Sequence, residues 1–143
     1  MPGDWYIITI MVKHLLFTSI LVFGFVLSSF TVAAGAEHAR VTPEELKAML
    51  QKKERVILID VRTPEEHNEA HIPGSVLMPH STLEGVTNLP NGGNIVLYCR
   101  SGKRSQTALD ILSRKGFKGL RDLEGGINAW TKSGGEVISG SAR

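Results

Sequence analysis

The chain has a single cysteine, Cys99, among its 143 residues. One cysteine cannot form a disulfide within the chain, so cross-linking of this kind is excluded as a source of stability. The chain also lacks an excess of one charge, because its formal net charge at pH 7 is only +2. So small an imbalance does not indicate binding to nucleic acid. No internal repeat or low-complexity tract is present, so nothing indicates a repeat architecture.

The long apolar run of the chain lies near its N-terminus. A short basic start that contains Lys13 precedes Leu15–Phe30, and small residues follow up to Ala34–Ala36. A basic region, an apolar region and an end of the Ala-x-Ala type are typical of a secretory signal peptide. We therefore predict a signal peptide over residues 1–36. Met11 is the better start, because the ten residues before it add nothing that a signal peptide needs.

An uncleaved membrane anchor is the alternative, since Leu15–Ala36 carries no charge and is long enough to cross a bilayer. The small residues at its end favour cleavage. Contact with a membrane is expected only if the segment stays uncleaved. In either case Glu37–Arg143, the size of one ordinary small domain, faces an extracytoplasmic compartment, which we expect to be the periplasm. A lone thiol in an oxidising compartment is expected to be either buried or chemically active.

Two short apolar runs, Val56–Ile59 and Ile95–Tyr98, have the composition of strands that are buried on both faces of a sheet. Ser75–Met78 and Leu120–Leu123 are further strand candidates. The segments around them carry helix signals, namely capping-box starts at Thr42 and Thr63, a stretch from Ser105 to about Arg114, and Ile127–Trp130. Alternating strands and helices predict a single α/β domain, with a central parallel sheet and helices on both faces.

Cys99 directly follows one predicted strand and stands at the start of a cationic loop. Arg100, Lys103 and Arg104 lie within five residues of the thiol, and Gly102 can adopt the positive φ that a loop around an anion needs. A strand–loop–helix turn points several N–H groups and the positive end of a helix at one place. The loop is therefore expected to stabilise a thiolate without a histidine base, and to favour a small, multiply charged anion as substrate.

The loop also matches a known family. It fits the pattern Cys-Arg-x-Gly-x-Arg/Thr of active rhodanese-type sulfurtransferases. Asp60–Arg62, Ala70–Ser75 and Gly125–Trp130 resemble other recurrent segments of that family, in the same order. The resemblance runs from about Val41 to Gly134. Together with the predicted export signal, it makes the chain similar to the small, single-domain periplasmic thiosulfate sulfurtransferases of phage-shock-protein-E type.

The resemblance implies a rhodanese-like fold and a reaction at Cys99. Cys99 would attack the outer sulfur of thiosulfate, release sulfite and carry a persulfide, which passes to cyanide or to a thiol acceptor. No metal and no organic cofactor are expected, and we expect a monomer. Asp60 and Arg62 would support the site. The residues expected to bind the substrate are Arg100, Ser101, Gly102, Lys103, Arg104 and Ser105.

Two other functions remain open. A cysteine-based phosphatase or arsenate reductase uses a similar loop, with an arginine six positions after the cysteine. Here that position holds Ser105, and Arg104 comes one residue earlier. The shorter loop also suits sulfur better than a tetrahedral phosphoryl group. A non-catalytic binding module on the same fold is the other alternative. Such modules usually lack the cysteine or the cations, and this chain has both.

The other candidate residues are expected to have structural roles. Asp60 and Arg62 are expected to form an ion pair that holds a loop. His67 and His71 stand four residues apart and could bind Zn²⁺ on a helix, but no third ligand is evident, and His71 is expected to fix its own loop by hydrogen bonding. Trp130 is expected to pack in the core. Lys52–Arg55 is expected to be a solvated helix end.

Overall fold

The computed structural model describes residues 39–91 and 93–140. The predicted signal peptide over residues 1–36 and the alternative start at Met11 lie outside these residues. Within them, no helix combines the length and the apolar character needed to cross a membrane.

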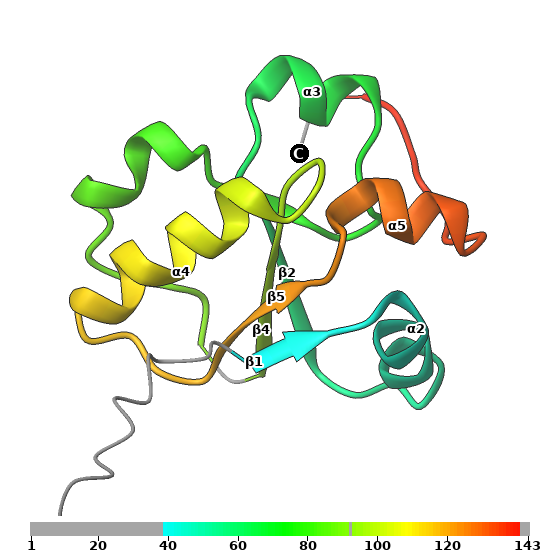
Figure 1. Cartoon of the computed structure of the whole chain (residues 1–143), viewed down its shortest axis with the longest axis horizontal. Coiled ribbons are helices and arrows are strands. Elements are labelled where there is room, and N and C mark those ends of the chain that lie inside the picture. The colour runs from blue at the N-terminus through cyan, green and yellow to red at the C-terminus, as the bar shows by residue number, and fades with distance from the viewer. Residues whose placement is uncertain (1–38, 92, 141–143) are drawn as a thin grey trace, which may run out of the picture. The chain divides into compact units, whose positions relative to one another are not determined.

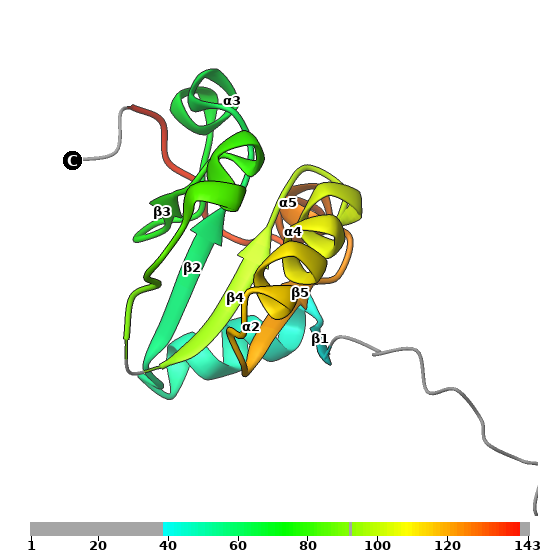
Figure 2. The same ribbon diagram turned by 90° about the vertical axis from the view of Figure 1, so that its left-hand side faces the viewer.

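A parallel sheet of five strands forms the centre of the domain (Figure 1), and Figure 2 shows the order of its strands, β1-β5-β4-β2-β3. The strands are β1 (Ala39–Val41), β2 (Val56–Asp60), β3 (Val76–Leu77), β4 (Asn94–Tyr98) and β5 (Leu120–Leu123). The predicted α/β class and parallel sheet are confirmed. β1 was not predicted, because three residues are too few to show the alternation that identifies a strand.

The helices begin close to where their capping signals lie. They are α2 (Pro43–Gln51), α3 (Pro64–Glu69), α4 (Lys103–Arg114), α5 (Gly126–Lys132) and a 3₁₀ helix, η1 (His80–Gly85). Thr42 and Thr63 form capping boxes with the glutamates three residues later, as predicted. η1 was not predicted. α4 begins two residues before Ser105, so Ser105 lies in its first turn.

Helices cover both faces of the sheet, as predicted (Figures 1 and 2). On one face, α4 and η1 form a buried cluster in which Leu109 packs with Leu97 of β4. On the other face, α2 and α5 contribute Leu46 and Trp130 to a cluster with Val96. Val96 and Leu97 are adjacent in β4 and point to opposite faces, because side chains alternate along a strand. β4 is therefore packed between the two helix layers, with one apolar cluster on each face.

Trp130 packs in the core, as predicted. Its side chain is only 4% exposed, and its indole N–H donates to the carbonyl of Glu136 at 2.7 Å. A buried indole needs such a partner, because its N–H would otherwise lose its hydrogen bond to water. The charged run Lys52–Arg55 is exposed, as predicted for a solvated helix end.

The start of α5 packs against the chain that follows β4. The N–H groups of Ile127 and Asn128 donate to the carbonyls of Cys99 and Arg100, at 2.9 and 3.1 Å. Gly126 makes this approach feasible, because a Cβ at that position would overlap the backbone of Cys99 and Arg100. Its φ of +61° also favours glycine. The pair Gly125-Gly126 thus supports the Cys99 loop from behind.

We predict that Gly126→Ala destabilises the domain by about 2–5 kcal/mol, since left-handed strain of about 1–2 kcal/mol adds to an overpacking cost of about 1–3 kcal/mol. Gly134→Ala is the matched control, because Gly134 also has a positive φ (+78°) but has open space around its Cα. It should cost only about 1 kcal/mol. Urea denaturation measures both free energies of unfolding. Equal losses for the two variants would show that close packing at Gly126 contributes nothing.

Candidate functional site

Cys99 lies directly after β4, where the carboxyl ends of the parallel strands meet. Its thiol is free and its side chain is only 1% exposed. The N–H of Gly102 donates to Sγ at 3.2 Å, and the hydroxyl of Ser105 lies 3.6 Å from Sγ. Gly102 has a φ of +95°, as its predicted role in the loop requires, and precedes the first turn of α4. The loop therefore curls around the sulfur and not away from it.

Opposing influences act on the pKa of the Cys99 thiol. Burial works to raise this pKa, because it disfavours the charged form. Hydrogen bonds from the Ser105 side chain and from the backbone N–H groups of Ser105, Ser101 and Gly102 outweigh burial, so the pKa lies below its ordinary value. The sequence analysis expected the N–H groups and the cations of the loop to stabilise the thiolate together. In the structure, the neutral donors of the loop have the larger effect, and the charge of Arg104 also interacts with the sulfur.

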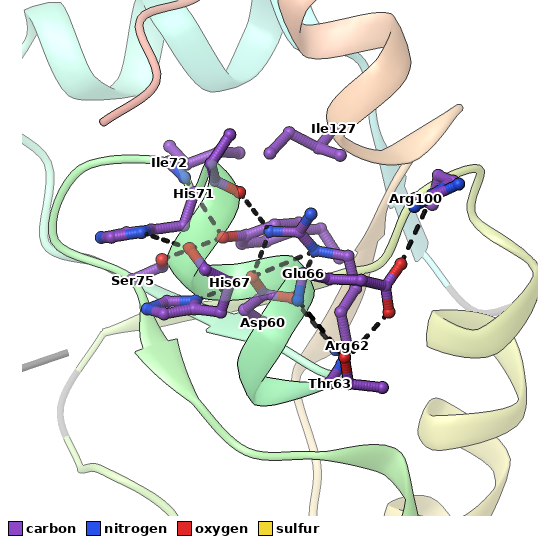
Figure 3. A network of polar contacts seen from close by, with 12 residues as sticks. Asp60, Arg62, Thr63, Glu66, His67, His71, Ile72, Ser75, Arg100 and Ile127 are labelled. Carbon is purple, nitrogen blue, oxygen red and sulfur yellow. Dashed lines mark hydrogen bonds and ion pairs between the residues drawn. The ribbon is translucent and has the colours of Figure 1, made fainter. Parts of the chain in front are cut away.

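The two arginines of the loop are turned toward Glu66 of α3. Arg104 donates from both terminal nitrogens to the two carboxylate oxygens of Glu66, at 2.7 and 2.8 Å. Nε of Arg100 lies 3.4 Å from the same carboxylate (Figure 3). Hydrogen bonds from Arg104 lower the pKa of Glu66 to about 2, so Glu66 is ionised at neutral pH. An internal carboxylate thus lies where the sequence analysis expected only an anionic substrate.

Two further residues of the loop, Lys103 and Ser101, were also predicted to bind substrate. Lys103 and Ser101 are exposed at the start of α4, on either side of the buried Gly102. Of the residues predicted to bind substrate, Gly102 and Ser105 thus contact the sulfur, and Arg100 and Arg104 contact Glu66. The loop accordingly has an inner shell of neutral donors and an outer shell of cations.

Asp60 and Arg62 form a buried ion pair at the end of β2, as the structural interpretation predicted (Figure 3). Nε and Nη2 of Arg62 donate to the carboxylate at 2.9 and 2.6 Å, and Nη2 also donates to the carbonyl of Ala70 at 2.7 Å. Burial works to raise the pKa of Asp60, but hydrogen bonds from Arg62 and His67 outweigh it and lower the pKa. The pair connects the end of β2 to Ala70, the residue that follows α3. Glu66 lies in the first turn of the same helix.

His67 and His71 belong to this network. Their rings stack with centroids 3.8 Å apart and an interplanar angle of 12°. Nδ1 of His67 lies 2.9 Å from Asp60, and Nδ1 of His71 donates to the carbonyl of His67 at 2.8 Å. The expected loop-fixing role of His71 is confirmed. No group of three or more metal-ligating side chains occurs in the part of the chain that the structure describes.

Two residues near Cys99 were missed by the sequence analysis. Glu66 was considered only as part of a capping box, although it lies only four residues after Arg62. Asp122 is fully buried in β5, and its Oδ1 accepts from the Ser105 hydroxyl at 2.5 Å. The available signal was a carboxylate in the predicted strand Leu120–Leu123, because strands are depleted in aspartate and buried carboxylates are rare without a specific partner.

Comparisons with known proteins identify the family of the domain. The family model of the rhodanese-like domain matches residues 42–133. The probable adenylyltransferase/sulfurtransferase MoeZ of Mycobacterium tuberculosis is 41% identical over 103 residues, which cover 70% of this chain and 26% of MoeZ. The chain thus spans about a quarter of the length of that relative. A sulfurtransferase of Allochromatium vinosum is 34% identical over 100 residues, which cover 69% of this chain and 94% of that protein.

Solved structures show the same fold. A rhodanese-related protein of Thermoplasma volcanium superimposes with a TM-score of 0.63 at 27% identity, over 71% of this chain and 98% of that one. The matched range 42–133 runs from the cap of α2 through the end of α5, so it includes Cys99 and every residue placed around it above. By sequence and fold, the chain belongs to the family of rhodanese-like domains.

Proposed function

We propose that this chain is a sulfurtransferase that carries sulfur as a persulfide on Cys99, with thiosulfate as donor and a thiol, or cyanide in an assay, as acceptor. One observation carries the proposal. The free sulfur of Cys99 accepts hydrogen bonds at the carboxyl edge of the sheet, and its pKa is lowered. The name of the Allochromatium vinosum relative, a sulfurtransferase nearly as short as the matched domain, supports the same reaction class.

The reaction has two halves that balance. In the first, the thiolate of Cys99 attacks the outer sulfur of thiosulfate, an S–S bond forms at Sγ, and the S–S bond of thiosulfate breaks. Sulfite leaves with the electron pair of that bond. In the second, the acceptor attacks the outer sulfur of the persulfide, and the Cys99 thiolate is regenerated. Neither half needs a metal or an organic cofactor, because the thiolate is the nucleophile in one half and the leaving group in the other.

The neutral donors and the cations have separate tasks in this scheme. The N–H groups of the loop and the Ser105 hydroxyl stabilise negative charge on sulfur, in the thiolate and in the persulfide. Arg104 lies near enough for its charge to interact with a Cys99 thiolate. It would bind the dianionic donor, together with Arg100 and Lys103. To do so, the donor has to displace the Glu66 carboxylate from the two arginines.

The geometry favours sulfur transfer over phosphatase or arsenate reductase chemistry. Those enzymes need a guanidinium six positions after the cysteine, and Ser105 occupies that position with its hydroxyl 3.6 Å from Sγ. A hydroxyl can bond a persulfide but cannot hold two oxygens of a phosphoryl group as arginine does. A non-catalytic binding module remains the second candidate, because the fold alone does not establish catalysis.

We further propose that the protein is exported to the periplasm and resembles the phage-shock-protein-E type of thiosulfate sulfurtransferase. The apolar N-terminal segment and its small-residue end support export. N-terminal sequencing of the exported protein should begin at Glu37. Recovery of the intact apolar segment in the membrane fraction would instead establish the anchored form.

We predict that Cys99→Ser abolishes sulfur transfer from thiosulfate to cyanide, because serine is a far weaker nucleophile and forms no persulfide. Intact mass after treatment with thiosulfate should show one added sulfur atom on the wild-type protein and none on the variant. The measurement is clean because Cys99 is the only cysteine of the chain. Full activity in the variant would refute the proposal, and a lack of any persulfide on the wild type would favour the binding module.

We predict opposite changes in KM for thiosulfate when the two partners of the Glu66–Arg104 contact are altered. Arg104→Ala should raise KM about tenfold or more, because it removes a charged hydrogen bond worth about 1.5–3 kcal/mol, and about 1.4 kcal/mol is a factor of ten. Glu66→Gln should lower KM several-fold, since it removes the competing anion. Glutamine can still complete the capping box with Thr63, so α3 is retained. Steady-state kinetics of thiocyanate formation measure both.

Two controls separate the contact from general electrostatics. Glu65→Gln removes the same charge one residue away, from an exposed side chain of the same helix, and should leave KM unchanged. Methanethiosulfonate is a donor with the shape of thiosulfate and one negative charge less, so Glu66→Gln should change its KM much less. An equal effect on both donors, or an equal effect of Glu65→Gln, would contradict direct competition by Glu66.

A further inference from the structure

The hydroxyl of Ser105 lies between two groups that can each carry negative charge. Its Oγ is 3.6 Å from Sγ of Cys99 and 2.5 Å from Oδ1 of Asp122. The carbonyl of Gly102 is a third acceptor, at 3.0 Å. The hydroxyl has one proton and can donate to only one acceptor at a time. Which acceptor receives the proton therefore depends on the state of the other two.

The position of Asp122 allows it to determine which acceptor receives the Ser105 hydroxyl proton. It lies in β5 beneath the Cys99 loop and is fully buried. Its Oδ2 finds no hydrogen-bond partner among the described residues, and Nη2 of Arg40 in β1 is 3.5 Å away. A buried ionised carboxylate normally has all its lone pairs satisfied, so an unpartnered oxygen points to a group that is not optimised as a permanent anion.

We propose that Asp122 is a positioning residue for Cys99, and that through Ser105 its carboxyl group decides whether the Ser105 hydroxyl donates to the sulfur. The inference rests on the proposed function only in treating Cys99 as the reactive atom. Ionisation of the thiol can be measured without any sulfur donor, so its outcome is separate from the outcome for Cys99→Ser.

The chain of three groups can exist in two arrangements that differ by the net transfer of one proton from Cys99 to Asp122, in a relay that moves two protons. In the first, the thiol of Cys99 donates to Oγ and the Ser105 hydroxyl donates to ionised Asp122. In the second, the S–H bond has broken and its proton is on Oγ, while the former hydroxyl proton is on Oδ1. Asp122 then donates to Ser105, which donates to the thiolate. The number of protons is the same in both, and the second arrangement holds the reactive sulfur.

The charged and polar surroundings of Asp122 fit a group that can keep a proton. Burial raises the pKa of Asp122 above its ordinary value, although hydrogen bonding from Ser105 and the charge of Arg40 work against this. Gln106, which follows Ser105 in α4, also lowers it. Once Asp122 is ionised as well, a thiolate on Cys99 faces a like charge across one hydroxyl, which disfavours the thiolate.

Asp122→Asn isolates the second arrangement. The guanidinium of Arg40 can only donate, so it favours the amide oxygen on its own side and turns the NH₂ group toward Ser105. The amide then donates to Oγ permanently, as protonated Asp122 would, and the Ser105 hydroxyl is directed to Cys99. The variant also cannot acquire the negative charge that opposes the thiolate.

The test is a pH titration of the Cys99 thiolate, by its ultraviolet absorbance and by the rate of alkylation with iodoacetamide. The wild type should titrate in two steps, because its thiol and carboxyl are coupled. Asp122→Asn should titrate in one step that is complete about one pH unit lower, which is a tenfold change in the ionisation constant. Ser105→Ala should titrate in one step at higher pH than the wild type.

The double variant shows whether the effect passes through Ser105. In a Ser105→Ala background, Asp122→Asn should shift the thiol pKa by less than a third of its effect in the wild type. Glu124→Gln is the matched control, because it removes the same charge two residues away from an exposed side chain. It should leave the titration unchanged. An equal shift in both backgrounds, or an equal shift from Glu124→Gln, would overturn the inference.

Arg40→Gln provides a second test that leaves the carboxyl group of Asp122 in place and alters only a side chain that is 45% exposed. Loss of this cation lets Asp122 keep its proton to higher pH, so a larger share of the thiolate should form in the first step. A direct through-space effect has the opposite sign, since removal of a positive charge raises a thiol pKa. A later onset of thiolate formation in Arg40→Gln would contradict the role assigned to Asp122.

Discussion

Every feature of the site depends on one constraint, which is that the sulfur of Cys99 is almost completely removed from solvent. Negative charge on a buried atom has to be met by donors from the chain, because water is not there to supply them. The loop meets this need with the N–H of Gly102 and the hydroxyl of Ser105. Both depend on the left-handed conformation of Gly102, which turns the backbone N–H groups inward and starts α4 early enough to include Ser105.

The loop keeps this shape because two separate parts of the fold hold it in place. On one side, the start of α5 donates to the carbonyls of Cys99 and Arg100, and the absence of a side chain on Gly126 permits the contact. On the other side, the Asp60–Arg62 pair fixes the end of α3, from which Glu66 reaches the loop arginines (Figure 3). A site with rigid supports needs little reorganisation when charge moves from sulfur to substrate and back.

Local patterns predicted most of the fold and the centre of the site. The apolar runs of β2 and β4, the capping boxes at Thr42 and Thr63, and the Cys99 loop are each contained in a few consecutive residues. β1 and η1 were missed because such short elements are defined by the partners they pack against. Glu66 and Asp122 were missed for a related reason. Their roles arise from contacts with Arg104 and Ser105, which are 38 and 17 residues away in the sequence.

The division between neutral donors and cations explains how one loop can serve both halves of a transfer reaction. If the cations alone stabilised the thiolate, each anionic donor that bound them would weaken that stabilisation and make the sulfur a poorer nucleophile. Because neutral donors hold the larger part of the charge on Cys99, the arginines can exchange Glu66 for a substrate with a smaller penalty of this kind. The exchange keeps the guanidiniums paired before and after binding, so the loss of the Glu66 contact offsets part of the electrostatic gain from the donor. Selectivity for a donor should then depend on shape and charge relative to a carboxylate, and not on attraction to an unpaired cationic pocket.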